Sequence, residues 1–287
     1  MERSVALVTG CSKGGIGFAF CENLTARGYI VYATARSLSS MDDLHHPNCR
    51  KCVLDVMSDE QANAVVAKII EDEGHIDLLI NNAGMPAAGP LIDWTIDATK
   101  NVFDTNVFSV LRLCRAVIPH MAERKQGTIL NIGSRAGEFA PPWFGIYAAT
   151  KSCLRTISEV LSLECRPFDI SVSHINTGTV QSRILDKLDT YLAPPGSLYG
   201  AFVHNIGRII EMGKGEGKAM DAGVFVESVL RKTIGRGLEA RKRKVPIEVL
   251  DGTGTFALMV LRWLPRSWYF NLIWRVLGKP EVKSKDA

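Results

Sequence analysis

The sequence lacks the features of several protein classes. No apolar run approaches the ~20 residues that a membrane-spanning helix requires, and no internal repeat or low-complexity tract is present. The formal net charge of +4 is too small to indicate a nucleic-acid partner. Seven cysteines, with no secretory leader ahead of them, favour reduced thiols, so we expect a cytoplasmic protein.

Metal ligands are also scarce. Cys49 and Cys52 follow His45 and His46, like the start of a zinc site, but no second cysteine pair at zinc spacing follows. The pair also lies where a strand is expected to start. We therefore predict no metal site.

Short runs rich in Val and Ile alternate with longer helical patterns, which is typical of βαβ units and a parallel sheet. The predicted strands are 5–9, 30–35, 51–55, 77–81, 128–132 and 170–175, with a weaker seventh at 245–250. The 287 residues, without a dividing linker, predict one α/β domain with a doubly wound (Rossmann), mostly parallel sheet of about seven strands. We place this domain at 1–252, with an irregular, lid-like loop at 181–221 and a helical extension at 253–287.

The first predicted strand runs into a glycine-rich turn, Thr9-Gly10-Cys11-Ser12-Lys13-Gly14-Gly15-Ile16-Gly17, and then into an apolar helix. Glycines let backbone N–H groups approach a pyrophosphate, and the helix N-terminus favours its charge. Taken alone, the turn is also compatible with a strand-to-helix connection that binds nothing.

The end of the second strand lacks the acidic residue that an NAD-selective protein usually offers to the adenosine ribose; Ala35 stands there, followed by Arg36. Arg36, helped by Ser12 and Lys13, supplies donors and positive charge for a 2′-phosphate. We therefore predict NADPH/NADP+ as the cofactor. The alternative is that Arg36 is a solvated surface charge.

Tyr147 and Lys151 are four residues apart, which places a phenol and an ammonium on one face of a helix, and Ser134 ends the fifth strand. Reduction of a carbonyl by hydride leaves negative charge on oxygen, so a donor must supply a proton. A free tyrosine titrates near ~10. We expect Lys151, together with a cationic nicotinamide in the oxidised state, to lower that pKa. Tyr147 would then donate the proton, and Ser134 would hydrogen-bond the substrate oxygen.

Together these motifs resemble the short-chain dehydrogenase/reductase family. The turn is similar to its Thr-Gly-x-x-x-Gly-x-Gly fingerprint with Gly14 as one additional residue, and Asn81-Asn82-Ala83-Gly84 matches the end of its fourth strand. Ser134, Tyr147 and Lys151 have its Ser-x12-Tyr-x3-Lys spacing. The resemblance covers nearly the whole chain and implies an NADPH-dependent enzyme that interconverts carbonyl and alcohol groups.

The resemblance also implies contacts with each part of the cofactor. At the phosphates of the glycine turn these are Gly10, Ser12, Lys13, Gly15, Ile16 and Gly17, and at adenine they are Asp55 and Val56. Beneath the nicotinamide ribose they are Asn82, Ala83 and Gly84, at the ribose hydroxyls Tyr147 and Lys151, and at the carboxamide Gly178, Val180 and Ser182. Thr177 stands where the family has proline.

Asn106 interrupts an apolar helical stripe. From the pattern alone, its amide is a satisfied core group. The resemblance implies instead a catalytic role, in which Asn106 holds a water that links Lys151 to solvent.

Aromatic residues near the expected site favour a hydrophobic carbonyl substrate, although such residues are equally typical of a core. The expected pocket walls are Pro142, Trp143, Phe144, Tyr191, Leu198, Tyr199 and Phe202.

The C-terminal segment is basic and aromatic. From Arg231 to Ala287, thirteen basic and five acidic residues give a net charge of +8, so the rest of the chain is −4. Between Phe256 and Leu277, tryptophans and arginines mix without any acidic residue. This suits a membrane interface, so we expect peripheral contact with endoplasmic reticulum or lipid droplets. The alternative is a helix pair that covers the pocket or forms a subunit interface.

A narrower resemblance, carried by the Val-Thr-Gly-Cys-Ser-x-Gly-Gly-Ile-Gly start and the Trp/Arg-rich tail, is to the fungal 1-acyldihydroxyacetone-phosphate reductases. It implies a lipid substrate, an acyl-dihydroxyacetone phosphate. The alternatives are ketones of steroids or of fungal secondary metabolism, an epimerase or dehydratase, and a nucleotide-sensing scaffold without turnover. The family also implies a homo-oligomer, a dimer or tetramer, built through helices at 97–121 and 148–165.

Overall fold

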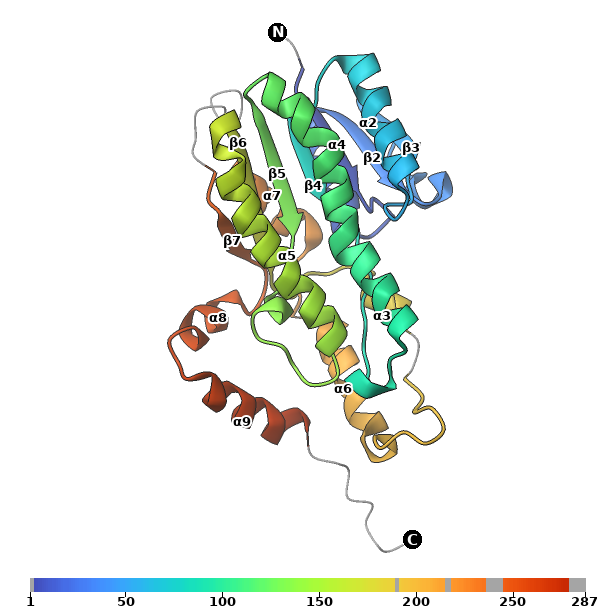
Figure 1. Ribbon diagram of the computed structural model, residues 1–287, viewed down its shortest axis with the longest axis vertical. Coiled ribbons are helices and arrows are strands. Elements are labelled where there is room, and N and C mark those ends of the chain that lie inside the picture. Colours follow the sequence, from blue (N-terminus) through green and yellow to red (C-terminus); the bar gives the residue numbers. More distant parts are fainter. Residues whose placement is uncertain (1–2, 189–190, 215–217, 236–244, 279–287) are drawn as a thin grey trace, which may run out of the picture.

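The computed structural model describes residues 3–188, 191–214, 218–235 and 245–278. Seven strands form one parallel sheet in the order β3-β2-β1-β4-β5-β6-β7 (Figure 1). Their bounds are β1 Val5–Thr9, β2 Ile30–Ala35, β3 Cys49–Val53, β4 Leu78–Asn81, β5 Gly127–Ile132, β6 Ile170–Thr177 and β7 Glu248–Asp251. The predicted doubly wound α/β fold is confirmed.

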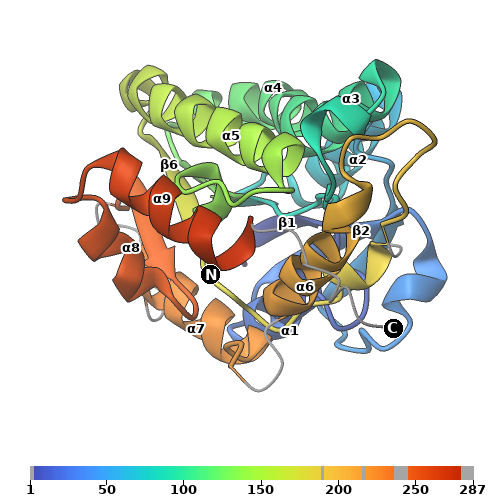
Figure 2. The same cartoon turned by 90° about the horizontal axis from the view of Figure 1, so that it is seen from below.

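Helices cover both faces of the sheet. One face packs against α1 (Ile16–Ala26) and α7 (Ala222–Thr233), and the other against α2 (Asp59–Glu73), α4 (Ser109–Glu123) and α5 (Gly145–Glu164). Figure 2 shows the two helical layers on opposite sides of the strands. Because both faces are covered, the central strands β1 and β2 are buried at every residue, which explains their uninterrupted apolar sequence.

The strand order reverses between β1 and β4, and in such sheets ligands bind beyond the carboxyl ends of the strands at this point. Figure 1 shows α6 (Val203–Lys214), α8 (Thr255–Leu261) and α9 (Arg266–Leu277) beyond these strand ends. α3 (Ile96–Phe103) continues through a π-helical turn, Asp104–Phe108, into α4.

The predicted strand positions need small corrections. The third strand begins at Cys49 rather than Lys51, because the Val31 N–H already bonds the Asn48 carbonyl and extends the pairing backwards. This edge strand is only half-buried, so its apolar pattern is weak. The seventh strand is Glu248–Asp251 instead of 245–250.

The expected irregular loop at 181–221 contains a helix, α6. Buried Ile206, Ile209 and Ile210 give it an apolar face at helical spacing. The glycines misled the prediction, because Gly207 lies in the helix with open space where a Cβ would be. The predicted C-terminal extension forms α8 and α9. Among the described residues, no helix has both the length and the apolarity to cross a bilayer.

Candidate active site

A cavity of about 480 Å³ lies at the carboxyl ends of the central strands. It is lined by the glycine turn, the segment after β4, the start of α5, the segment after β6, and by α6, α8 and α9. The predicted site residues that line it are Gly10, Ser12, Lys13, Gly15, Ile16, Asn82, Ala83, Gly84, Ser134, Tyr147, Lys151, Gly178, Val180 and Ser182. Gly17, Arg36, Asp55, Val56 and Asn106 lie outside its lining.

The glycine turn has the conformation that a phosphate cradle needs. Gly10 has a φ of +72°, and a Cβ on Gly17 would lie 2.5 Å from the Gly10 carbonyl oxygen. Gly15 is the N-cap of α1, and no side chain caps that helix end. The first backbone N–H groups of α1 therefore remain available for an anion, which fits the pyrophosphate of a dinucleotide.

The structure accommodates Gly14, the additional residue of the turn. Gly14 adopts a left-handed conformation with a φ of +74°, and the Gly15 N–H bonds the Ser12 carbonyl at 3.0 Å. A Cβ on Gly14 would lie 2.9 Å from Cδ of Arg183. The insertion is thus absorbed as a tight turn that leaves the start of α1 in place.

Asn82 fixes the glycine turn to β4. Its side-chain Nδ2 donates to the carbonyls of Thr9 at 2.8 Å and Gly10 at 3.1 Å. The backbone N–H groups of Asn82 and Ala83 both donate to the Thr9 hydroxyl at 3.0 Å. These bonds explain why an Asn-Asn-Ala-Gly sequence follows this strand.

Arg36, the residue predicted to bind the 2′-phosphate, is exposed just after β2. The Ser12 hydroxyl lies 3.3 Å from that of Ser40, and Lys13 forms an ion pair with Asp43. Asp55 accepts a hydrogen bond from the Met57 N–H at 3.0 Å, and the neighbouring Val56 is buried.

The N-terminal part of α5 carries the predicted catalytic pair, Tyr147 and Lys151. Lys151 is only 4% exposed, and its Nζ donates to the Ile132 carbonyl at 2.8 Å. Its Nζ lies 5.8 Å from the centre of the Tyr147 ring, which agrees with the predicted common helix face. Burial lowers the pKa of Lys151 to about 8.

Ser134 and Tyr147 meet in the cavity. Burial raises the pKa of Tyr147, and a hydrogen bond with the Ser134 hydroxyl opposes this rise. Ser134 also accepts the Ala136 N–H at 3.2 Å, which orients the hydroxyl. Without the cofactor, desolvation is the larger cause and the pKa of Tyr147 is raised; the lowering expected from Lys151 together with the oxidised nicotinamide stays a prediction.

Asn106 is 1% exposed and sits in the π-helical turn between α3 and α4. Its side chain accepts the Met85 N–H at 2.8 Å and donates to the Met85 carbonyl and the Thr150 hydroxyl, both at 3.0 Å. Asn106 therefore clamps the segment that follows Gly84. This contact is the satisfied core amide that the pattern alone predicted; the water link to Lys151 stays a prediction.

The segment after β6 closes the cofactor side of the cavity. A Cβ on Gly178 would lie 2.4 Å from the Thr253 carbonyl oxygen, so only glycine fits beside that loop. The Thr177 hydroxyl, in place of a proline, donates to the Ile175 carbonyl at 3.2 Å. Ser182 faces the cavity beyond it.

The predicted pocket walls are largely wrong. Of the seven expected residues only Phe144 lines the cavity. Trp143 has a φ of +70°, and its ring packs against Tyr199 and Phe202 in an apolar cluster that also contains the lining residues Phe144 and Ile209. The apolar lining comes instead from other side chains, which include Phe139, Pro141, Leu185, Ile209, Met212, Leu258, Leu261, Ile273 and Leu277. The C-terminal helix pair covers the cavity, as the alternative interpretation of that segment stated.

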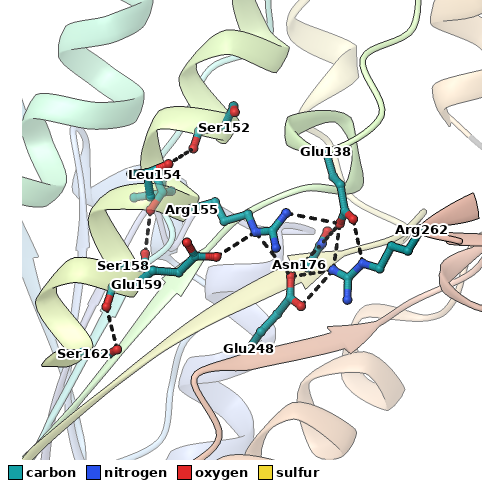
Figure 3. Close-up of polar contacts among 11 residues, drawn as sticks. Glu138, Ser152, Leu154, Arg155, Ser158, Glu159, Ser162, Asn176, Glu248 and Arg262 are labelled. Carbon is teal, nitrogen blue, oxygen red and sulfur yellow. Dashed lines mark hydrogen bonds and ion pairs between the residues drawn. The ribbon is translucent and has the colours of Figure 1, made fainter. Parts of the chain in front are cut away.

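A charged cluster holds this helix pair beside the catalytic segment (Figure 3). Arg262, at the end of α8, donates to Glu138 at 2.6 and 2.7 Å and to Glu248 at 2.8 and 2.9 Å. Burial alone would raise the pKa of Glu138, but Arg262 and Arg155 hold it below its usual value. Asn176 donates to both carboxylates. Residues more than 100 positions apart in the sequence are thereby joined.

His174, on β6, lies near the catalytic pair and was not predicted from the sequence. Its ring packs so closely on Gly133 that a Cβ there would lie 2.1 Å from its Cε1. Burial, together with the charges of Lys151 and Arg155, lowers the pKa of His174 to about 3, so the ring is neutral. A single histidine in a strand gives no sequence signal for such a position.

Comparisons with known proteins agree with this geometry. The family model for short chain dehydrogenases matches residues 4–192. A short-chain dehydrogenase of Penicillium ochrochloron is 37% identical over 93% of this chain and 95% of its own length. An NADPH-dependent 1-acyldihydroxyacetone phosphate reductase of Schizosaccharomyces pombe is 36% identical over 63% of this chain and 61% of its own length.

Solved structures lead to the same family. A crystal structure of a short-chain dehydrogenase from Streptomyces avermitilis superposes with a TM-score of 0.80 at 27% identity, and it covers 96% of this chain and 98% of that one. The glycine turn, the Ser-Tyr-Lys set and these matches converge, and the chain belongs to the short-chain dehydrogenase family.

Proposed function

We propose that this protein reduces a ketone or aldehyde on a hydrophobic substrate to an alcohol, with NADPH as the cofactor. The observation that carries the proposal is that Ser134, Tyr147 and Lys151 line the same cavity as the glycine turn. NADPH bound along that turn would supply hydride to the substrate carbon.

The protein's own groups would handle the charge on the substrate oxygen. Ser134 donates a hydrogen bond to that oxygen, and Tyr147 transfers its phenolic proton as negative charge develops. A raised pKa keeps Tyr147 protonated before the reaction, as a proton donor must be. The Lys151 ammonium, held by the Ile132 carbonyl, stabilises the phenolate that remains.

The preference for NADPH rests on charge at the end of β2. Arg36 is exposed and follows Ala35, so no carboxylate stands at the usual NAD-selective position. The similar reductase of Schizosaccharomyces pombe is named as NADPH-dependent. Replacing Arg36 by Asp should raise the KM for NADPH at least about tenfold and spare that for NADH. An unchanged preference would show that Arg36 is only a surface charge.

A lipid-like substrate is supported by the apolar cavity and by the likeness to acyldihydroxyacetone phosphate reductases. Steroid or secondary-metabolite ketones are the alternative within the same chemistry. A panel of acyl-dihydroxyacetone phosphates, steroid ketones and polyketide ketones, followed by NADPH oxidation, tests the proposal. Absence of NADPH oxidation with every carbonyl would favour a nucleotide-sensing scaffold, or an epimerase or dehydratase that recycles its cofactor.

We further propose that the outer face of α8–α9 binds an anionic lipid surface. Phe256, Trp263, Trp268 and Leu272 are 76%, 89%, 65% and 59% exposed, and the acid-free segment adds Arg275 to this face. Aromatic rings at headgroup depth with nearby arginines suit such a surface.

The lipid test uses phosphatidylcholine vesicles with and without phosphatidylserine. Replacing Trp263 and Trp268 by Ser should reduce cosedimentation with the anionic vesicles, whereas Val224→Ser, an exposed apolar change on α7, should leave it intact. Equal cosedimentation of both variants would contradict the lipid contact. A shift from oligomer to monomer in the Trp263/Trp268 variant would assign this face to a second copy of the chain instead.

A homo-oligomer built through the predicted helices is supported by exposed apolar side chains on and beside α4 and α5. Phe108, Val160, Leu163 and Phe168 are 42–54% exposed. Sedimentation equilibrium of wild type and of Leu163→Glu tests it, because a charge in such an interface would dissociate the subunits. A monomeric wild type would contradict it.

A further inference from the structure

The cavity contains an arginine that no carboxylate neutralises. Arg135 directly follows Ser134, starts the short 3-10 turn Arg135–Gly137 and lines the cavity. Burial lowers the pKa of Arg135, because a charged guanidinium is costly away from water. Its side chain donates only to the Thr253 carbonyl, at 3.4 Å, and has no acidic partner in the described parts of the chain.

The other positive charges of the cavity differ from Arg135. Outside the catalytic set, each has an acidic partner: Lys13 with Asp43, Arg183 with Asp186 at 3.5 Å, and Lys214 with Glu211 at 2.6 Å. Lys151 belongs to the catalytic set itself. Among the described residues that line the cavity, and apart from Lys151, Arg135 is thus the cation without an acidic partner.

The guanidinium is also held in place. A Cβ on Gly254 would lie 2.3 Å from Nη1 of Arg135, so the loop before α8 packs directly against it. Tyr269 of α9 lines the cavity beside it and donates its hydroxyl to the Phe139 carbonyl at 3.0 Å. A fixed, partly buried and unpaired charge costs folding free energy unless a ligand compensates it.

We propose that Arg135 binds an anionic group of the substrate, a phosphate ester or a carboxylate a few bonds from the reducible carbonyl. The inference rests on the proposed function and specifies its substrate. Ser134 and Arg135 are adjacent, so their Cα atoms are about 3.8 Å apart, and one substrate can reach both. The planar guanidinium suits phosphate and carboxylate oxygens, and the apolar lining from α6, α8 and α9 accommodates a tail.

The test compares wild type with Arg135→Met on matched ketones of equal chain length: an acyl-dihydroxyacetone phosphate, its dephosphorylated counterpart and a β-keto carboxylate. We expect kcat/KM for the preferred anionic ketone to fall at least about tenfold and that for the neutral ketone to stay within about twofold. Arg135→Lys, which keeps the charge, should retain part of the activity. Arg208→Met, at an exposed arginine of α6 that does not line the cavity, is the control and should match wild type.

A second readout does not need turnover. Dihydroxyacetone phosphate and inorganic phosphate should raise the Tm of the wild type but not that of Arg135→Met. Without an anion, Arg135→Met should melt no lower than wild type, because it removes an unpaired, partly buried charge.

Three results would overturn the anion site: equal losses for anionic and neutral ketones, weaker NADPH binding by Arg135→Met, or a lower Tm of this variant without an anion. The first or the third would make Arg135 structural, and the second would assign it to the cofactor. A wild type that reduces no ketone yet is stabilised by phosphate would instead contradict the proposed reaction while keeping the site.

Discussion

The two halves of the cavity are built in different ways. On the cofactor side, two parts are each formed by residues close in sequence: the Gly10–Gly17 turn and the Tyr147–Lys151 pair on one helix. The Asn82 amide, which bonds the Thr9 carbonyl from 73 positions away, joins the turn to β4. On the substrate side, hydrogen bonds such as that from Arg262 to Glu138 join α8 and α9 to the segment after β5. These two residues are 124 positions apart in the sequence. Local geometry therefore forms the main parts of the first half, whereas the second half depends on long-range contacts throughout.

The largest effect should come from the catalytic pair. Tyr147→Phe removes the proton donor but leaves the helix and the glycine turn intact, so kcat should fall about 10²–10⁴-fold while NADPH binding persists. Steady-state kinetics and fluorescence titration with NADPH check this. If activity survived, proton donation would have to come from another group, and the proposed chemistry would be wrong.

The next effect concerns the cofactor half alone. Gly17→Val places a side chain where a Cβ already lies 2.5 Å from the Gly10 carbonyl, so the turn must open. The Kd for NADPH should rise at least about tenfold. Gly28→Ala is the control. Gly28 lies in a positive-φ turn after α1, and an added Cβ there would have open space, so this change strains the backbone without touching the glycine turn. NADPH affinity that is equal in wild type and Gly17→Val would mean that the turn does not hold the phosphates.

The pH dependence of the reaction follows from Lys151. Its pKa is lowered to about 8, so the side chain is fully protonated well below that pH and loses its positive charge as the pH rises through it. Since kcat/KM for NADPH reports groups of the free enzyme, it should fall about tenfold per pH unit above this value. A profile that is flat to pH 10 would contradict a catalytic role for the charged Lys151.

The smallest effect should come from the substrate half. Arg262→Met removes four hydrogen bonds to Glu138 and Glu248 and leaves those carboxylates facing each other, which should cost about 1–2 kcal/mol of unfolding free energy. KM for a large ketone should rise several-fold, whereas the Kd for NADPH should stay unchanged. Urea unfolding and kinetics measure both. A weaker NADPH affinity would show that the two halves are coupled.

The same difference between local and long-range contacts explains which parts of the fold and of the site could be predicted from the sequence. Continuous apolar runs located β1 and β2 to the residue, and the four-residue spacing placed Tyr147 and Lys151 on one helix face, because these patterns depend on backbone geometry. Ser134 was assigned to the same cavity by the family resemblance. The pocket walls were misassigned, because nothing local shows that the Trp143 ring packs against Tyr199 and Phe202. Distant neighbours in the sequence determine the roles of three further residues, Arg135, His174 and Arg262. No spacing in the sequence predicts such partners.

The most direct test of the account is the transfer of hydride itself. With NADPH that carries deuterium at both C4 positions of the nicotinamide, and any ketone that the enzyme reduces, mass spectrometry and NMR locate the label. The account predicts one deuterium on the carbinol carbon of the alcohol, and formation of this labelled alcohol that is about 10²–10⁴-fold slower after Tyr147→Phe. Alcohol without the label, or labelled alcohol formed at the full rate by Tyr147→Phe, would contradict it.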